Sequence, residues 1–488
     1  MDLSNSTKAT QLTTLQRLLL AGMLALYFFY LNRNTLSVHF ALDDLSNMRY
    51  YYVFKGSWIQ LIQSQFALWR GDYRPMGGLF YMPIFHFAGL NPAPYQAVLL
   101  VLMLGAVYLV QRVAASLGAG DAAAYLAALI ACYHAGLANL YYNAAFIYDV
   151  LCGFFYLAAF LYYLRIRNRG FLLNTGQTIV FLLLFLCALN SKEMAVTLPV
   201  MMVVYELIYH PVAVRDFAKV RVWIGGPGRA IVAAGLLDAV DVYGKVAAPD
   251  ALIHAGGYSP VFNLSRVYDF QKNLLQDLCM AWHWVPGWTV ILAIWAALAL
   301  LAWVWPGRPV LRLLFWFLVF VPLPIEFLPS KREACFCLLM VGAGIFVSVV
   351  LVDLARLAAR IVSHLAALPP LQEKAIAAAI VLGAVFFWAQ TQFHYQADIA
   401  RIQMPQLGWE SWDLIQQLPA FERPRPGSHV AFLQAPLSGT DTWGLALLWI
   451  HDKSVDVHVW TQGVLSPDQL AHTDHIYTFE NRKLMQLK

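Results

Sequence analysis

The sequence predicts an all-α polytopic membrane protein that ends in a small α/β domain outside the membrane. Of its 488 residues, 60% are hydrophobic and only 12% are charged, whereas soluble domains carry roughly 25% charged residues. The chain also contains a series of apolar stretches that approach the roughly 20 residues needed for a helix to cross a bilayer. These stretches end near residue 391, where the composition changes.

About eleven apolar stretches are expected to be membrane-spanning helices, because unpaired backbone amides are costly inside hydrocarbon. The seventh is the weakest, since it contains Asp238 and Asp241. The predicted spans are 15–31, 94–112, 122–138, 146–164, 172–189, 194–209, 229–246, 286–305, 310–328, 334–355 and 373–391.

Basic residues gather in alternate loops, which contain almost no acids and are therefore expected to be cytoplasmic. This places the N-terminus inside and the segment from about 392 outside. We expect a multi-pass protein of a bacterial inner membrane whose site faces the periplasm. The basic residues that carry this argument are Arg112, Arg165, Arg167, Arg169, Arg215, Lys219, Arg221, Arg229, Arg308, Arg312, Arg356, Arg360 and Lys374.

Two domains follow from these patterns. Residues 1–391 form the transmembrane domain, with a long first outer loop at 32–93, and residues 392–488 form a soluble extracytoplasmic domain. The alternating stretches "HVAFLQAP" and "SVDVHVW" are typical of strands. The chain has no Walker loop or GxGxxG after a strand, so no nucleotide cofactor is expected. Its small net charge of +5 and the lack of long like-charge blocks argue against a nucleic-acid partner.

Mixed acidic and basic side chains gather in the loops predicted to lie outside. Each could be an ordinary solvated residue, but ionisable groups at a membrane boundary are costly and tend to face a cavity or one another. We therefore expect a shared polar site on the outer face. The residues concerned are Asp43, Asp44, Arg49, Lys55, Arg70, Asp72, Asn143, Asp149, Lys192, Glu193, Glu326, Lys331, Arg332 and Glu333.

The chemistry of these side chains suits a phosphate-linked lipid donor. Arginine holds a phosphate through a planar fork and lysine through a point charge. A carboxylate within reach can accept the proton of an attacking hydroxyl. Glycosyl transfer from a lipid-phosphate sugar needs these groups and no nucleotide fold.

Several motifs resemble the GT-C class of membrane glycosyltransferases, in particular the bacterial relatives of the protein O-mannosyltransferase group and of the transmembrane and tetratricopeptide-repeat O-mannosyltransferases. The acidic pair Asp43-Asp44 and the "YRPM" run at Tyr73 and Arg74 resemble elements of their first outer loop. "NSKEMAVTLPVMMVVYE", with Lys192 and Glu193, and "SKREACFCLLMVGAGI", with Arg332, resemble later motifs. The likeness extends from residue 1 to about 360 and implies a GT-C-like fold.

The resemblance implies that one acid of the pair is the general base, with Asp44 slightly favoured over Asp43. The other acid would orient the acceptor or hold a divalent cation, the only cofactor considered. The alternative is a helix cap. Arg332 with Lys331 is the candidate for the donor phosphate, or else these side chains contact lipid headgroups.

The supporting residues have two interpretations each. Lys192 either reaches the phosphate or pairs with Glu193, while Arg74, next to Tyr73, could brace the acidic loop. Asp149 either lines the site or stabilises the first turn of its helix. Four residues expected near the outer interface could stack on sugar, bind metal or anchor the chain: His134, His283, Trp282 and Trp284.

The expected function is an inverting glycosyltransferase that moves a sugar, mannose first among the candidates, from a polyprenyl-phosphate donor to an acceptor hydroxyl on the outer side. The acceptor would be a protein, a glycolipid or a polysaccharide. One alternative transfers another group, such as phosphoethanolamine or aminoarabinose, onto lipid A. The other is a transporter or lipid-handling protein, although transporters commonly show related halves, which this sequence lacks.

Overall fold

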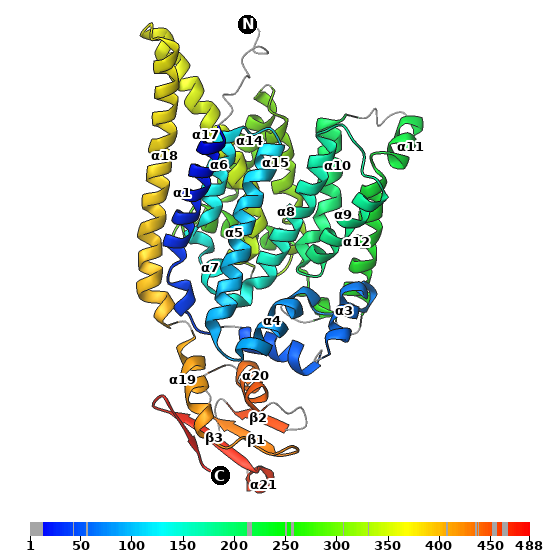
Figure 1. The fold of residues 1–488 in the computed structure, drawn as a ribbon, viewed down its shortest axis with the longest axis vertical. Helices are drawn as coiled ribbons and strands as arrows, with labels where there is room; N and C mark the ends of the chain where they lie inside the picture. The colour runs from blue at the N-terminus through cyan, green and yellow to red at the C-terminus, as the bar shows by residue number, and fades with distance from the viewer. Residues whose placement is uncertain are drawn as a thin grey trace.

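The protein is a bundle of helices with a small sheet at one end (Figure 1). The computed structural model describes residues 13–41, 43–54, 57–211, 217–248, 251–254, 258–305, 307–329, 331–406, 408–434, 437, 439–450, 456–460 and 467–488. Helix α1 begins at the end of the bundle that lies opposite the sheet (Figure 1). Lys55 and Arg215, named above for the outer and basic loops, lie outside the described residues.

A helix occupies each of the eleven apolar stretches. Six helical stretches, at α1, α5, α8, α15, α17 and α18, are long and apolar enough to cross a membrane, and α6, α9 and α14 are shorter apolar helices. The number of spans and their orientation therefore stay predictions. The helices are α1 (Thr14–Asn32), α5 (Pro92–Ser116), α6 (Asp121–Cys132), α8 (Ile147–Arg167), α9 (Thr175–Leu189), α10 (Leu198–Tyr209), α12 (Arg229–Ala247), α14 (Trp288–Val304), α15 (Pro309–Phe320), α17 (Cys337–Leu365) and α18 (Pro370–Asp398).

Helix ends follow local capping chemistry. The Thr13 and Asn174 side chains each accept a hydrogen bond from a backbone amide three residues on, and each forms a capping box. Helix α6 ends at Cys132, six residues before the predicted end of its span. Tyr133 and His134 are extended, and His134 Nδ1 accepts a hydrogen bond from the Gly136 amide at 3.2 Å, which starts a new turn.

Shorter helices connect the long ones. In Figure 1, α3 and α4 lie at the end of the bundle that is nearer the sheet, whereas α11 lies at the other end. The shorter α-helices are α2 (Asp44–Arg49), α3 (Trp58–Phe66), α4 (Pro75–Ala88), α7 (Asn139–Tyr142), α11 (Phe217–Gly225), α13 (Leu264–Leu278) and α16 (Leu323–Glu326). The remaining turns of the bundle are η2 (Thr35–Ser37), η3 (Tyr50–Phe54), η4 (Leu68–Arg70), η5 (Ala135–Leu137), η6 (Ala144–Phe146), η7 (Glu193–Thr197), η8 (Leu252–His254), η9 (Glu333–Phe336) and η10 (Ile399–Gln403).

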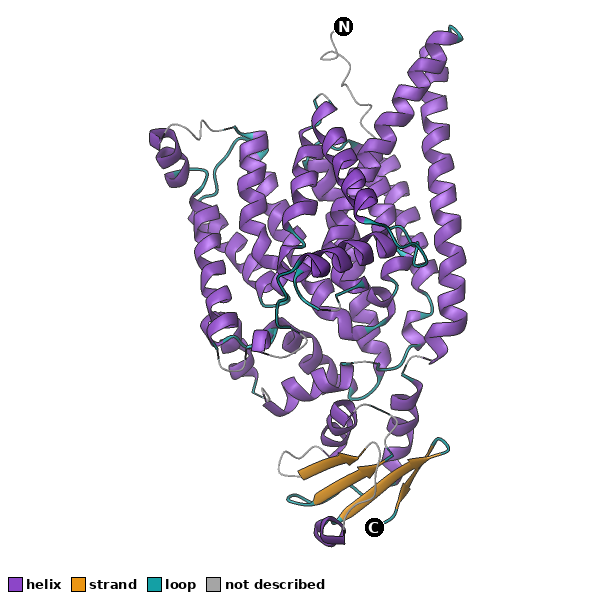
Figure 2. Cartoon of the chain, turned by 180° about the vertical axis from the view of Figure 1, so that it is seen from behind, coloured by secondary structure: helices purple, strands orange, loops and turns teal. Residues whose placement is uncertain are grey.

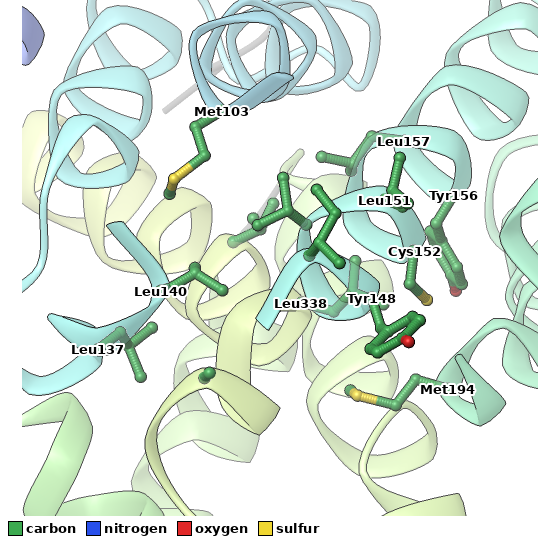
Figure 3. Close-up of a cluster of buried hydrophobic side chains, with 14 of the residues drawn as sticks. Met103, Leu137, Leu140, Tyr148, Leu151, Cys152, Tyr156, Leu157, Met194 and Leu338 are labelled. Carbon is green, nitrogen blue, oxygen red and sulfur yellow. The ribbon is translucent and has the colours of Figure 1, made fainter. Parts of the chain in front are cut away.

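The hydrophobic core is centred on α8, which lies inside the bundle, whereas α1 and α18 lie at its edge (Figure 1). Figure 3 shows α8 side chains, among them Tyr148, Cys152 and Tyr156, packed with Met194 and Leu338 from elsewhere in the chain. At the far end of α8, Arg167 forms a buried bidentate ion pair with Glu206 of α10. Arg167, read above as a basic loop residue, is therefore also a buried link between two helices.

The C-terminal domain is a four-stranded sheet with helices, as the alternating sequence predicts (Figure 2). The strand order is β2-β1-β3-β4; the first three strands are parallel and β4 is antiparallel to β3. The predicted boundary at 391/392 falls inside α18, which continues to Asp398. The elements are η11 (Met404–Gln406), α19 (Trp409–Gln417), η12 (Leu418–Ala420), β1 (His429–Leu433), α20 (Gly439–Ile450), β2 (Asp456–Trp460), α21 (Pro467–His472), β3 (His475–Glu480) and β4 (Lys483–Gln486).

This domain contacts the chain just before the acidic pair. The Ser411 hydroxyl donates to the Phe40 carbonyl at 2.5 Å, and the His39 ring stacks on Trp412 with 4.4 Å between centroids. Helix α20 packs on α2 so closely that a Cβ at Gly444 would lie 2.8 Å from the Leu45 carbonyl oxygen. The C-terminal domain thus holds the backbone on both sides of the acidic pair.

Candidate functional site

The two adjacent acids have opposite surroundings. Asp44, the first residue of α2, is fully buried. Its Oδ2 accepts a hydrogen bond from the Ala41 amide at 3.1 Å, and its Oδ1 accepts one from the Tyr81 hydroxyl at 3.2 Å. Asp43 is exposed, and its side chain makes no capping hydrogen bond. The pair therefore combines one carboxylate held inside the loop with one that solvent and ligands can reach.

Arg74, in the segment between α1 and α5, is fixed by an ion pair with Glu193. Its guanidinium donates through Nε and Nη2 to the Glu193 carboxylate at 3.1–3.3 Å. The charge also lies 5.0 Å and 5.1 Å from the ring centroids of Tyr73 and Tyr148. Arg74 adopts a left-handed backbone with φ 39°, immediately before Pro75 begins α4. Such a conformation is costly for a side-chain-bearing residue and persists where surrounding contacts hold it.

The charges of this group keep each other ionised. Burial alone would raise the pKa of Glu193, but Arg74, Lys245 and Lys192 outweigh it and lower the pKa to about 2. Burial alone would lower the pKa of Arg74, and the charge of Glu193 holds that pKa well above its ordinary value instead. Burial raises the pKa of the Tyr73 phenol, and among its charged neighbours Asp43 acts in the same direction. The charge of Asp43 therefore acts on the Tyr73 phenol.

Lys192 lies deeper than the residues just described. Its Nζ contacts Asp149 Oδ1 of α8 at 2.5 Å and Cys335 Sγ at 3.5 Å. Lys and Asp are both nearly fully buried. Burial alone would lower the pKa of Lys192, but Asp149 outweighs it and raises that pKa. The sequence suggested that Lys192 either reaches the phosphate or pairs with Glu193. In the structure Lys192 pairs with Asp149, and Glu193 pairs with Arg74 instead.

The turn at 331–333 sends its three side chains in different directions. Lys331 Nζ lies 3.9 Å from the ring centroid of Tyr258. Arg332, half-exposed, donates to the buried Asp277 carboxylate at 3.0 Å. Glu333 is left-handed with φ 50°, accepts a short hydrogen bond from Asn139, and donates its backbone amide to Asp277 at 2.9 Å. Asp277 thus anchors the turn through two residues.

A cavity of about 300 Å³ opens beside the Tyr73–Arg74 group. One wall is polar and combines two acids and two bases with two phenols: Asp72, Glu193, Arg74, Lys245, Tyr73 and Tyr258. The other wall is apolar and is formed by Pro260, Phe262, Leu323, Pro324, Phe327 and Leu328. We call this space the basic cavity, because Lys245 lines it and Lys331 lies on Tyr258 at its edge.

Three residues of this region were not singled out from sequence. Lys245 falls inside the seventh apolar stretch, and its Nζ contacts the Asp241 carboxylate at 3.0 Å. The i, i+4 spacing of Asp241 and Lys245 was the available signal, because a helix brings such a pair together. Tyr258 and Asp277 carry no motif, and only the tertiary structure brings them to Lys331 and Arg332.

His134 is buried away from the basic cavity. Its Nε2 lies 3.1 Å from the Leu278 carbonyl oxygen, and its ring packs against Trp388. Among the residues that the structure describes, no group of three or more His, Cys, Asp or Glu side chains could hold a metal ion. A cation at Asp43 or Asp44 would thus need ligands from a substrate or from water.

Comparisons with known proteins concern the fold. No protein-family model matches the chain, and no curated protein matches it. Among solved structures, the crystal structure of ArnT from Cupriavidus metallidurans bound to undecaprenyl phosphate superposes with a TM-score of 0.55 at 13% identity, covering 97% of this chain and 98% of that one. The apo oligosaccharyltransferase of Archaeoglobus fulgidus gives a TM-score of 0.46 at 12% identity, covering 91% of this chain and 64% of that one.

The likeness to ArnT extends over nearly the whole of both chains, including the C-terminal domain. It supports the GT-C-like membrane fold expected from the sequence. At 13% identity it carries no residue roles, no sugar and no acceptor. The chemistry must be argued from the site itself.

Proposed function

We propose that this protein is a glycosyltransferase that takes a sugar from a polyprenyl-phosphate donor and transfers it to an acceptor hydroxyl on the outer side of a membrane. The observation that carries the proposal is the basic cavity, where cationic side chains meet an apolar wall. A lipid-linked phosphate needs both surfaces, because its headgroup is anionic and its tail is hydrocarbon. That the fold resembles a protein solved with undecaprenyl phosphate bound is consistent with this class of donor.

The donor phosphate would lie at Lys331 and Lys245. Lys331 rests on the Tyr258 ring rather than on a carboxylate, and Lys245 lines the cavity although it also contacts Asp241. Both can stabilise the negative charge that grows on the leaving phosphate as the anomeric bond breaks. Arg332, expected from sequence at the phosphate, does not line the cavity and donates to Asp277, so its part would be to hold the 331–333 turn. Lys192 is enclosed with Asp149, so it would not contact the donor phosphate. It would act through its electrostatic field and through packing.

Asp43 would be the general base. It is the exposed member of the acidic pair, and its charge acts on the phenol of Tyr73, which lines the basic cavity. Asp44 is enclosed by the Ala41 amide and the Tyr81 hydroxyl, so its part would be to hold the loop. This reverses the slight preference for Asp44 drawn from sequence.

The reaction follows from these positions. Asp43 accepts the proton of the acceptor hydroxyl while the hydroxyl oxygen attacks the anomeric carbon. The bond between that carbon and the phosphate oxygen breaks, and the electron pair leaves with polyprenyl phosphate. Attack opposite the leaving phosphate inverts the anomeric centre. Mannose is the first sugar to test, and an amino sugar is the second.

The test is release of polyprenyl phosphate from polyprenyl-phosphate mannose by the purified chain in lipid discs, with a cell-envelope extract as acceptor. Loss of a general base typically costs 10²–10⁴-fold in rate, so Asp43→Asn is expected to lose roughly 100-fold or more while its melting temperature stays that of the wild type. Asp44→Asn is expected to lower the melting temperature and to retain more turnover than Asp43→Asn.

Two results would contradict the assignment. Equal losses in both variants would show that the loop, rather than one exposed base, is what matters. A wild type that releases no polyprenyl phosphate from mannose, glucose or aminoarabinose donors would overturn the transferase itself.

A further inference from the structure

A second cavity, of about 350 Å³, is lined by Glu333 of the 331–333 turn and shares no lining residue with the basic cavity. Lys331 faces Tyr258 of the basic cavity, whereas Glu333 lines the second one. The turn is held in place by Asp277, which accepts from both Arg332 and the Glu333 amide. We call this second space the aromatic cavity.

We propose that the aromatic cavity binds a saccharide, either neutral or carrying an amino group, and that this saccharide belongs to the acceptor. The second part of the inference rests on the proposed transferase function. The first part, that the cavity binds such a sugar, stands on its own geometry and can be tested alone.

The lining of the cavity combines rings with planar polar groups. Tyr142, Trp282 and Tyr395 contribute the rings, and the last two pack edge to face at 5.3 Å. Asn139, Glu333 and Gln403 contribute amides and a carboxylate. Rings supply apolar surface for the C–H face of a pyranose, while amides and carboxylates can accept and donate in pairs to neighbouring hydroxyls.

Hydrogen bonds within the lining set the polar groups before any ligand arrives. The Tyr142 hydroxyl donates to Gln403 Oε1 at 3.2 Å, and Asn139 donates to Glu333. These two bonds leave the other polar atom of each acceptor side chain, Gln403 Nε2 and Glu333 Oε1, for a ligand. Groups fixed in this way lose little side-chain entropy on binding, which favours affinity for a hydroxylated ligand.

The left-handed backbone of Glu333 supports a functional role for this wall. The approach of η5 to the end of α13 is also unusually close, because a Cβ at Gly136 would lie 1.8 Å from the Asp277 carbonyl oxygen. Gly136 lines the aromatic cavity. This backbone contact fixes η5, which lines the cavity, against the end of α13.

Charge separates the two cavities. Among the described residues that line the aromatic cavity there are two acids, Glu333 and Asp398, and no Lys or Arg. Asp398 pairs with Arg401 at 3.1 Å, so it is chiefly Glu333 that disfavours a phosphate there, whereas an amine or a neutral ring is accommodated. The lipid-phosphate donor and the sugar acceptor would thus be sorted to two separate cavities.

The experiment is saturation-transfer NMR on the full chain in lipid discs, with glucosamine disaccharide and glucosamine 6-phosphate as probes. We expect saturation transfer to the disaccharide and at least fivefold less to the phosphorylated sugar. Trp282→Ala should reduce the disaccharide signal at least fivefold, and Asp398→Asn, at a half-exposed side chain, should reduce it about threefold without affecting folding.

The matched control is Trp284→Ala. Trp284 is in the same loop, is 37% exposed against 38% for Trp282, and does not line the cavity. It should retain the wild-type signal within twofold. Equal loss in both tryptophan variants, or no saturation transfer to the wild type, would overturn the proposal.

Polyprenyl phosphate release separates this inference from the function on which its second part rests. If wild type releases polyprenyl phosphate and Trp282→Ala raises KM for the acceptor at least tenfold without changing KM for the donor, the cavity is the acceptor subsite. If donor turnover is present but sugar binding is absent, only the aromatic cavity proposal fails. If sugar binds and no donor is turned over, the transferase fails and the acceptor role falls with it.

Discussion

Arg74 and Glu193 are the residues whose charges most affect the site's shape. Glu193 has a pKa of about 2, because Arg74 and two lysines outweigh its burial. A carboxyl whose folded pKa is depressed contributes stability above its unfolded pKa of roughly 4.3 and loses it as the pH falls toward the folded value. The folded pair should therefore stay ionised down to about pH 3, and its contribution to stability should be complete above about pH 5.

Glu193→Gln is expected to lower stability by about 3 kcal/mol, because Arg74 would keep a buried charge without its partner. Thermal unfolding in lipid discs should show a constant gap between wild type and variant from pH 5 to pH 9. The gap should narrow only below about pH 4, where Glu193 of the unfolded wild type is already protonated.

Glu373→Gln provides the comparison, because the Arg360–Glu373 pair is solvent-exposed with 3.6 Å between its atoms. Exposed pairs contribute roughly 0–1 kcal/mol, so its melting temperature should stay near wild type. A gap for Glu193→Gln that closes between pH 6 and pH 8 would contradict the assigned charge states.

The sequence indicated many of these residues but not their partners. Tyr73, Arg74 and Glu193 were expected in one polar site, and the structure brings them together. The Lys192–Asp149 pair was not foreseen, since residues 43 positions apart meet only through the packing of α8 against η7. Likewise, Lys245 was read as part of an apolar span, because a single lysine does not break such a pattern.

At the scale of elements, the basic cavity depends on how closely η4 approaches α12. A Cβ on Gly244 would lie 2.0 Å from the Leu68 carbonyl oxygen, and one on Gly71 would lie 2.5 Å from the Gly244 carbonyl oxygen. Two glycines facing each other thus let the segment before Tyr73 lie against the helix that carries Lys245. Without this approach the two residues would not share one cavity wall.

Gly244→Ala is expected to push η4 away from α12, since overpacking typically costs 1–3 kcal/mol. Its melting temperature should fall, and KM for the polyprenyl-phosphate donor should rise at least about fivefold, since small displacements of a site are costly. Both can be measured on the same preparation by thermal unfolding and by polyprenyl phosphate release.

Gly235→Ala is the control on the same helix. A Cβ there would meet no atom within 4 Å among the described residues, and alanine has the higher helix propensity. The melting temperature should be equal to or higher than that of the wild type, and KM for the donor should be unchanged. Similar losses in the two variants would mean that the glycines of α12 matter for some reason other than contact with η4.

Helix positions were predictable at this scale, whereas helix ends were less so. Each apolar stretch contains a helix because backbone pairing and hydrophobicity act together along one segment. Helix α6 stops early at Cys132 because His134 accepts a hydrogen bond from the next turn. The end of this helix depends on one local hydrogen bond, which cannot be predicted from the pattern of apolar residues.

At the scale of the whole molecule, the C-terminal domain acts on the acidic loop through backbone contacts. Gly408 has φ 73°, and a Cβ there would lie 2.3 Å from the Phe40 carbonyl oxygen. Because α19 and α20 hold the backbone around residues 39–45, the domain should position Asp43 without contacting substrate.

Gly408→Ala should lower turnover about tenfold or more by displacing the acidic loop. Gly427→Ala shares the left-handed backbone, with φ 79°, but no described atom lies within 4 Å of its Cβ position. It should show only the backbone strain of about 1–2 kcal/mol and keep turnover within twofold. Equal turnover in the two variants would show that the domain does not position the loop.

If the basic cavity holds a lipid-linked phosphate, Lys331→Ala should bind polyprenyl phosphate about tenfold more weakly than wild type, equivalent to roughly 1.4 kcal/mol. The matched control is Lys272→Ala, because Lys272 also lies over a tyrosine, with its Nζ 5.7 Å from the Tyr268 centroid, but pairs with Asp269 and does not line the cavity. Lys272→Ala should bind polyprenyl phosphate as wild type does. Unchanged binding in both variants, or equal weakening in both, would contradict a phosphate site in this cavity.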